Sequence, residues 1–252
     1  MQNQMSSVAG ISGSATIAYG ASQEAWQGYM NYLHALIRET GARSVLELGG
    51  GANPALTLDE VREQGLDYTI LDISQTELDK APAGYSKLQA DLAHPLNNIS
   101  TQHDFIFSKM LAEHVSNGRV FHENVLKLLK PGGIAFHFFP TLYAPPFIAN
   151  RLLPERLASW LLQLLSPRNR YQQGKFPAYY SWCRGPSARH LGRLEKLGYQ
   201  IYHYYGFYGH EPYYARIPLV RIVHRWCVNF LIKHPNPLLT SFAYMVVRKA
   251  QR

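Results

Sequence analysis

Residues 44–56, SVLELGGGANPAL, carry the main indication of the fold. The stretch begins as an apolar run typical of a buried β-strand. It passes through an acid, Glu47, into three consecutive glycines at 49–51. Backbone without side chains lets a ligand approach closely, and an apparent helix follows near residues 55–64. A strand, a glycine-rich turn and a helix in this order predict a ligand-binding turn at the end of a strand.

Strands and helices alternate outward from this stretch. Strands are predicted at 44–48, 68–73, 87–91, 103–110 and 134–140. A helix is expected at 22–39, capped by Ser22, with Trp26, Met30, Leu33 and Ile37 on one stripe. Another is expected at 121–130, closed by Pro131-Gly132-Gly133. Alternation over about 100 residues predicts an α/β protein with a parallel, doubly wound sheet.

The pattern changes after Pro140. The features expected there are a broken amphipathic stretch at 145–165, an aromatic loop at 171–186, a helix at 187–199 and strands at 199–207 and 242–249. Residues 1–20, rich in Ser, Gly and Ala, predict a mobile arm. We therefore expect one domain over 1–252. It comprises an arm and helix at 1–40, a cofactor-binding core at 41–140, and acceptor-binding and lid insertions with the last strands at 141–252.

Three kinds of ligand fit a glycine-rich turn. A phosphate-cradling loop requires Gly-Lys-Ser/Thr after the glycines, and this stretch contains no lysine. A dinucleotide fingerprint has a third glycine where Pro54 stands, and it would place a pyrophosphate beside Glu47. A cationic ligand without phosphate suits that acid better.

Five motifs in order resemble those of class I S-adenosylmethionine-dependent methyltransferases. They are VLELGGG (45–51), YTILDIS (68–74), ADL (90–92), FIFSKMLAEH (105–114) and LKPGG (129–133). The resemblance implies a Rossmann-like, seven-stranded doubly wound sheet and S-adenosyl-L-methionine as the cofactor. It extends over residues 44–139.

The resemblance also assigns residues to the cofactor. The amides of residues 49–51 would take its carboxylate, Glu47 would lie near its methionine part, Asp72 would bind the ribose and Asp91 the adenine. Asp72 lies 23 positions after Gly49, close to the spacing of about 20 expected for a ribose-binding acid. The other residues assigned to the cofactor are Gly50, Gly51, Asn53, Ile73, Leu92, Ser108 and Tyr19.

Methyl transfer needs a base only when the acceptor must lose a proton, since positioning supplies most of the catalysis. Three histidines are candidate catalytic residues: His137 late in a strand, His114 after the preceding strand, and His210 in a later loop. Each has a structural alternative, such as shaping the cofactor wall for His114 or lying solvated in its loop for His210. No metal site is predicted, because the eleven histidines lack zinc-ligand spacing.

Charge divides the chain into two parts. Residues 1–140 carry a net charge of −5, and residues 141–252 carry +13 with three acids in all. Within the second part, residues 216–233 form a basic amphipathic segment with Arg221, His224 and Arg225 on one face. Such a helix suits an anionic membrane interface, and it would equally suit packing on the domain with a solvated basic stripe. Nucleic acid is the less favoured partner, since the basic residues are dispersed among aromatics.

The acceptor is expected to be a small molecule or glycan. FPTLY (139–143), KFPAYYSWC (175–183) and KHPNPLLTS (233–241) loosely resemble methyltransferases of bacterial surface-polysaccharide synthesis. That likeness implies O-methylation of a sugar hydroxyl, on an acceptor that is anionic or lipid-linked. The alternatives are an RNA methyltransferase and a membrane-peripheral, methyltransferase-like binding protein without turnover.

Three features of the sequence indicate the cellular compartment. Two cysteines, no signal-peptide pattern and no uncharged apolar run of about 18 residues indicate a cytoplasmic protein. The basic segment allows it to be peripheral to the inner face of the membrane.

Overall fold

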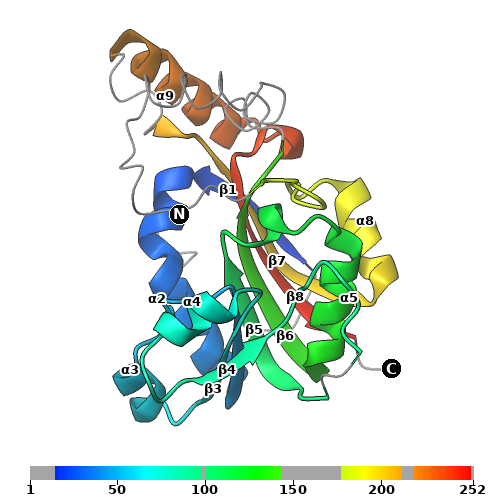
Figure 1. Cartoon of the computed structure of the whole chain (residues 1–252). Coiled ribbons are helices and arrows are strands. Elements are labelled where there is room, and N and C mark those ends of the chain that lie inside the picture. Colours follow the sequence, from blue (N-terminus) through cyan, green and yellow to red (C-terminus); the bar gives the residue numbers. More distant parts are fainter. Residues whose placement is uncertain (1–14, 98–99, 143–176, 212–217, 251–252) are drawn as a thin grey trace.

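The computed structural model describes residues 15–97, 100–142, 177–211 and 218–250. Its centre is an eight-stranded sheet in the order β1-β7-β8-β6-β5-β2-β3-β4 (Figure 1). The strands are β1 (Thr16–Ala21), β2 (Ser44–Leu48), β3 (Asp67–Asp72), β4 (Ser86–Gln89), β5 (His103–Lys109), β6 (Leu129–Pro140), β7 (Tyr199–Tyr208) and β8 (Phe242–Lys249). All run in one direction except β8, which is antiparallel to both of its neighbours. The doubly wound α/β prediction is confirmed, with eight strands in place of seven because β1 pairs with β7.

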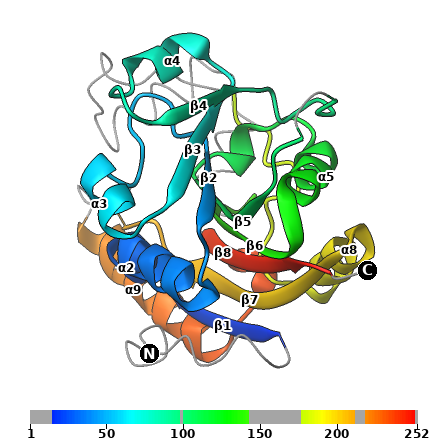
Figure 2. The same cartoon turned by 90° about the horizontal axis from the view of Figure 1, so that it is seen from below.

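Helices cover both faces of the sheet, since a largely parallel sheet is buried on both sides. They are α2 (Ser22–Thr40), α3 (Leu58–Glu63), α4 (Gln75–Lys80), α5 (Gly118–Leu128), α8 (Ala188–Leu197) and α9 (Pro218–Lys233), with short 3₁₀ helices η1 (Ala112–His114) and η3 (Pro237–Leu239). Seen along the sheet, α2 lies on one face and α5 and α8 lie on the other (Figure 2). In Figure 1, α9 stands above the carboxyl ends of the parallel strands.

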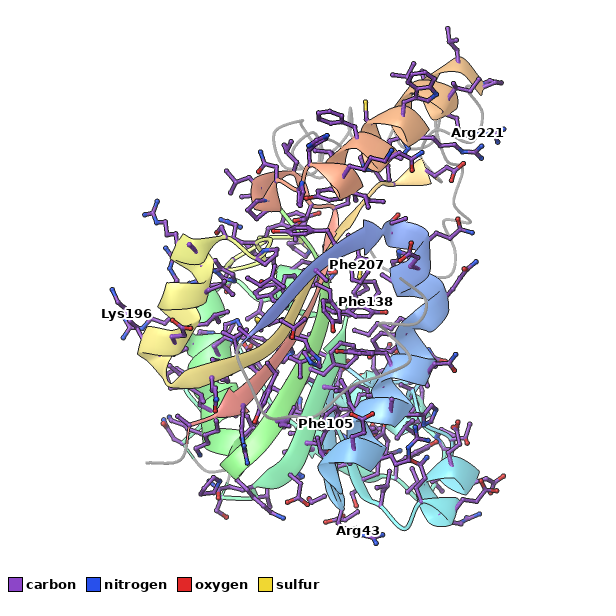
Figure 3. The ribbon with its side chains drawn as sticks, turned by 180° about the vertical axis from the view of Figure 1, so that it is seen from behind. Arg43, Phe105, Phe138, Lys196, Phe207 and Arg221 are labelled. Atoms are coloured by element: carbon purple, nitrogen blue, oxygen red, sulfur yellow. The ribbon has the colours of Figure 1, made fainter. Side chains whose placement is uncertain are left out.

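Aromatic rings fill the layer between α2 and the sheet. The ring of Tyr29 lies 5.5 Å from that of Phe136, and Phe138 lies 5.0 Å from Tyr244. Phe138 and Phe207 are labelled in this interior in Figure 3. Because side chains alternate along a strand, residues 136 and 138 of β6 point toward α2 while residue 137 points toward α5.

The amino-terminal region differs from its prediction. Residues 16–20 belong to β1 and not to a mobile arm. Ala21 takes the N-cap position of α2 without a side-chain bond, so Ser22 is the first helical residue and not the cap. The buried face of α2 is centred on Tyr29 and Leu33, and Trp26 is 44% exposed. Leu33 and Ile37 are buried as expected, whereas Tyr29 and Tyr32 are buried in place of Trp26.

The boundary between α5 and β6 also differs. The helix starts at Gly118, capped by the Asn117 side chain, and ends at Leu128. Pro131-Gly132-Gly133 falls within β6, where the pairing with β5 shifts register and Gly132 has a φ of +76°. The helix α5 therefore ends where β6 begins, before Pro131 is reached. The predicted stretch at 145–165 and the start of the aromatic loop lie outside the described residues.

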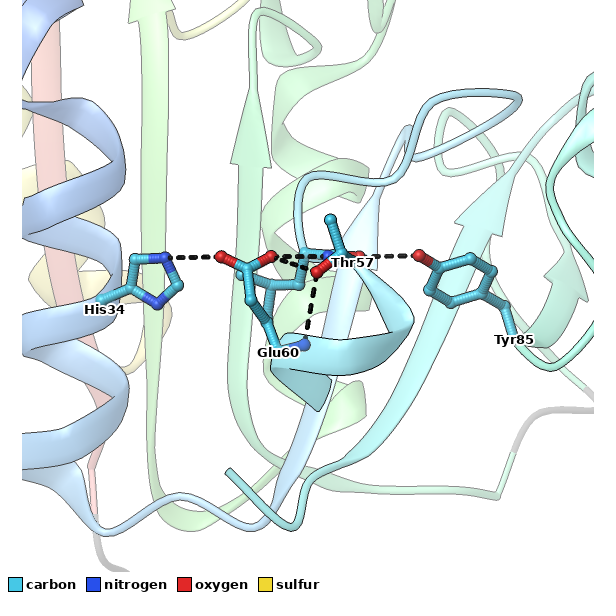
Figure 4. Close-up of polar contacts among 5 residues, drawn as sticks. His34, Thr57, Glu60 and Tyr85 are labelled. Atoms are coloured by element: carbon cyan, nitrogen blue, oxygen red, sulfur yellow. Dashed lines mark hydrogen bonds and ion pairs between the residues drawn. The ribbon is translucent and has the colours of Figure 1, made fainter. Parts of the chain in front are cut away.

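A hydrogen-bonded cluster anchors the chain after the glycine-rich turn (Figure 4). Thr57 and Glu60 form a reciprocal capping box at the start of α3. The Glu60 carboxylate also lies 3.5 Å from His34 Nε2 on α2. The Tyr85 hydroxyl donates to the Leu56 carbonyl at 2.9 Å. The exit of the turn is thereby tied to α2 and to the approach to β4.

Candidate active site

The carboxyl ends of the strands form one edge, and the chain reverses its direction of winding there. From β2 the sheet extends outward to β3 and β4, and the chain then returns to place β5 on the other side of β2. Open α/β sheets bind ligands at such a switch point. The glycine-rich turn begins at this point, directly after Leu48.

The glycines shape the turn. Gly49 and Gly51 have φ values of +78° and +43°, which side chains rarely adopt. A Cβ on Gly51 would lie 3.0 Å from Asp72 Oδ2, and one on Gly49 would lie 3.0 Å from Leu111. The Gly49 amide donates to the Leu71 carbonyl at 2.7 Å, so that amide is not free to bind a ligand as expected. Within the described residues, the amides of residues 50 and 51 make no hydrogen bond.

Glu47 stabilises the turn by accepting hydrogen bonds within it. Its carboxylate is 6% exposed and accepts hydrogen bonds from the Ala55 amide at 3.0 Å and from the Tyr68 hydroxyl. Burial raises the pKa of Glu47, while the bonds from Tyr68 and Ala55 and the charge of Lys109 oppose that shift. The Glu47 carboxylate is therefore bonded within the protein and is not accessible to a ligand, in contrast to the expectation.

Asp72 is the last residue of β3, and Asp91 follows the end of the neighbouring β4 by two residues. Asp72 Oδ1 accepts from the Ser74 amide at 2.9 Å, and Asp72 Oδ2 faces Gly51. The Ala90 amide donates to the Asp72 carbonyl at 3.0 Å, which places Asp91 directly beside this strand end. Asp91 Oδ1 accepts from the Ala93 amide at 2.8 Å. The structure thus brings the glycine turn and both predicted acids together at the carboxyl edge of the sheet.

The remaining cofactor candidates divide into exposed and buried positions. Asn53 is exposed, and its amide closes the turn by donating to the Gly50 carbonyl at 3.0 Å. Ile73 is 59% exposed beside Asp72, so it offers apolar surface at the crevice. Leu92 is buried.

Ser108 and Tyr19 lie away from the glycine turn. The Ser108 side chain is fully buried on the α5 face, where its hydroxyl lies 2.8 Å from His137 Nδ1. The Ser108 hydroxyl is therefore hydrogen-bonded to His137 and not to the glycine turn. Tyr19 is on β1, and its ring stacks on that of Tyr208 at 5.7 Å. Tyr19 thus belongs to the β7 side of the edge.

His137 is enclosed in the sheet layer. It is 0% exposed and contacts the rings of Phe121 and His122, and burial lowers its pKa to about 3. It is therefore neutral at physiological pH. An acceptor could reach it only if α5 moved away, so the geometry weighs against a base role.

His210 is also buried, at the end of β7. Its Nδ1 lies 3.2 Å from Ser241 Oγ, and its amide donates to His224 Nε2 on α9 at 3.2 Å. Burial lowers the pKa of His210 to about 4. The residue links α9 to the sheet and does not lie in an open loop.

His114 is the accessible member of the three, in η1 just after β5. Its side chain is 34% exposed, and its Nδ1 lies 2.9 Å from the Pro177 carbonyl oxygen. Because a carbonyl only accepts, Nδ1 carries the hydrogen of the neutral ring and Nε2 carries the lone pair. Glu113 Oε1 lies 3.7 Å from that Nε2, and burial raises the pKa of Glu113 to about 8.

Lys109 and Tyr29, which lie near Glu47, were not singled out from the sequence. Lys109 Nζ lies 4.6 Å from the ring centroid of Tyr29 and 5.8 Å from that of Trp26. The Tyr29 hydroxyl is buried with no hydrogen-bond partner among the described residues. The signal was available in part, because Lys109 is the last residue of a strand that ends at the crevice.

Comparison with known proteins decides the family. A family described as "Methyltransferase domain" matches residues 22–204 of the chain, from the start of α2 into β7. The chain belongs to this methyltransferase family. A search of curated protein sequences finds no match.

Solved structures agree on the fold of this methyltransferase. An S-adenosylmethionine-dependent methyltransferase from Clostridium acetobutylicum is 11% identical with a TM-score of 0.54, covering 89% of this chain and 92% of the other. One from Mesorhizobium loti is 18% identical with a TM-score of 0.50, covering 87% and 96%. Phosphoethanolamine N-methyltransferase 2 of Haemonchus contortus, in complex with S-adenosyl-L-methionine, is 16% identical with a TM-score of 0.50, covering 88% and 53%. The cofactor is S-adenosyl-L-methionine.

The described residues fit this cofactor. The face of Gly51 beside Asp72 has no room for a Cβ, and the second oxygen of Asp72 is turned toward it. A carboxylate at this place can accept from both hydroxyls of a ribose. The buried Tyr29 hydroxyl adds a further unpaired polar group near Glu47. The described residues contain no group of three side chains able to hold a metal ion.

Proposed function

We propose that this methyltransferase methylates a hydroxyl oxygen of a sugar, a glycan or a similar small-molecule acceptor. The observation that supports this is the pairing of Trp26 with Lys109 at the edge beside the cofactor crevice. Trp26 is 44% exposed, and the Lys109 ammonium lies over its ring. An indole stacks on an amphipathic sugar ring, and an ammonium binds a phosphate or carboxylate on the same acceptor.

The chain's residues have distinct tasks in this reaction. S-adenosyl-L-methionine supplies a methyl group already activated on a sulfonium. The Asp72 carboxylate and the glycine turn position the cofactor, and Trp26 and Lys109 orient the acceptor. His114 accepts the hydroxyl proton at Nε2, because its Nδ1–H is held by the Pro177 carbonyl. The Pro177 carbonyl holds the ring in place when it becomes the imidazolium, since Glu113, with its pKa raised to about 8, is mostly uncharged at neutral pH.

The test is release of S-adenosylhomocysteine by the full-length protein with a panel of nucleotide-linked and lipid-linked sugars. We expect His114→Gln to lower kcat by about a hundredfold, the lower range for loss of a general base, with cofactor affinity unchanged. His34→Gln is the matched control, since His34 has a similar side-chain exposure of 31% and lies on α2 beside Glu60. The glutamine amide can still donate to Glu60, so this control should keep full activity.

The proposal would be overturned by turnover of RNA and none of the sugars. An RNA acceptor would also show binding that falls steeply with salt, whereas a sugar acceptor would show little salt dependence. Equal activity of His114→Gln and wild type would remove His114 from the mechanism and leave positioning as the source of catalysis.

A further inference from the structure

The helix α9 contacts the protein through its polar side. Arg225 donates to Glu211 Oε1 at 2.8 Å, and Arg221 Nε lies 4.0 Å from the same oxygen. His224 Nε2 accepts from the His210 amide, and the Val228 side chain lies against Gly209. Figure 3 shows Arg221 on α9, well beyond the core residues Phe138 and Phe207. The basic residues predicted to face solvent thus lie on or near the side that joins α9 to the domain.

The opposite side of α9 is apolar and exposed. Leu219, Trp226 and Phe230 are 74%, 77% and 61% exposed, and Ile222 and Val223 are more than half exposed. At about 100° per residue, these five positions fall within one stripe. No residue of α9 is buried against the part of the chain that the structure describes. This orientation is the reverse of that expected for a surface helix, whose apolar face packs on its own domain.

The charged residues of α9 itself are all basic, and Glu211, which precedes the helix, pairs with two of them. The helix, PLVRIVHRWCVNFLIK, contains no acid, and Lys233 ends it. Arg225 is 58% exposed even while paired with Glu211. An exposed apolar stripe with a tryptophan, on a helix that ends in Lys233 and keeps Arg225 58% exposed, complements the interface of a bilayer with anionic headgroups. A nucleic acid would use the cations but would leave the stripe in water.

We propose that α9 is a membrane-docking helix, which inserts the stripe of Leu219, Ile222, Val223, Trp226 and Phe230 into the surface of an anionic bilayer. No described helix is long and apolar enough to cross the bilayer. Since α9 stands at the carboxyl edge of the sheet (Figure 1), docking turns the candidate active site toward the lipid surface. A consequence, which rests on the proposed function, is that the acceptor glycan is lipid-linked.

The experiment is co-sedimentation of the full-length protein with vesicles of phosphatidylcholine, alone or mixed with phosphatidylglycerol. We expect binding to the mixed vesicles that weakens with salt, and little binding to the neutral ones. The Trp226→Ser/Phe230→Ser variant should bind about a hundredfold more weakly, since each buried aromatic contributes about a factor of ten or more. Ile17→Ser, which removes an exposed apolar residue of β1, is the matched control and should bind like wild type.

Depth of insertion gives a second readout. Brominated acyl chains should quench the fluorescence of wild type more than that of Trp226→Phe, which leaves three of the four tryptophans. Calorimetry with S-adenosyl-L-methionine on the same samples separates this inference from the proposed function, because vesicle binding needs neither cofactor nor acceptor.

Three results would overturn the inference. One is absence of vesicle binding by wild-type protein that still binds the cofactor. Another is a dimer that the double variant converts to monomer, which would make a second copy the occupant of the stripe. The third is a large loss of thermal stability in the double variant, which would place the stripe against the protein's own residues, such as 143–176.

Discussion

The two halves of the sheet are held together in different ways. On the β2–β4 side, short-range hydrogen bonds shape the site: Glu47 to Ala55, Asp72 to Ser74, and Thr57 to Glu60. On the β6–β8 side, the bonds join distant segments, such as Tyr32 to His203, which are 171 positions apart. Local bonds fix a turn that a cofactor requires in one shape. Long-range bonds hold the β6–β8 side, and among the described residues none of them passes through that turn.

The largest expected effect lies on the cofactor side. Asp72→Ala should weaken S-adenosyl-L-methionine binding by about a hundredfold, because two charge-assisted hydrogen bonds to ribose hydroxyls are lost. Calorimetric titration of the purified protein measures this change directly. Asp67→Ala is the matched control, since Asp67 begins the same strand at its opposite end.

The control should bind the cofactor like wild type. If both variants bind equally well, Asp72 is a structural residue that only orders the Ser74 turn, and the cofactor must take its hydroxyl contacts elsewhere along the edge.

The same contrast explains how far the sequence could predict the molecule. The positions of Gly51 and Asp72 were predictable because a short motif specifies a tight turn and a strand end. The role of Glu47 was not, since its partner Tyr68 lies 21 positions away on another strand. The prediction of His137 as a base was misleading, because the sequence does not show which face of the sheet its side chain takes. In the structure it lies beneath α5. The orientation of α9 depends on Glu211 and His210, which no periodicity within the helix reveals.

The next largest effect is expected on the free energy of unfolding, from loss of the Tyr68–Glu47 hydrogen bond. Tyr68→Phe removes the hydroxyl that donates to buried Glu47, and should lower the free energy of unfolding by about 2 kcal/mol. The melting temperature should fall by roughly 2–4 °C for each kcal/mol. Tyr85→Phe removes a bond to the Leu56 carbonyl from a half-buried ring, so it should cost less. Equal melting temperatures for the two variants would show that Glu47 finds another donor and does not depend on Tyr68.

A buried histidine on the other side of the sheet predicts a pH effect. Burial, with the charges of Arg184 and Arg193, lowers the pKa of His190 to about 3. The unfolded chain has a histidine pKa of about 6.5, so the neutral form is favoured by folding. This contribution to stability is complete above pH 6.5 and is lost as the pH falls from there toward 3.

His190→Leu tests that contribution. Over the acidic range, the unfolding free energy of the variant should decline less than that of wild type, by about 1.4 kcal/mol per pH unit. Denaturant unfolding at neutral pH and at successively lower pH measures the difference between the two slopes. Buried carboxyl groups such as Glu113 act equally in both proteins and cancel. Parallel slopes would mean that His190 becomes protonated without cost in the folded state.

The smallest expected effect is the most informative about α9. Trp226 is 77% exposed, so Trp226→Ser should change the unfolding free energy by less than about 0.5 kcal/mol, as for an ordinary surface position. A tryptophan packed against protein would instead cost roughly 3–5 kcal/mol on truncation. Denaturant unfolding in the absence of lipid separates these values clearly. A near-zero change means that the largest side chain of α9 contributes nothing to holding the domain together. Its apolar surface then has to be explained by something outside the domain, which is the condition that docking on a bilayer requires.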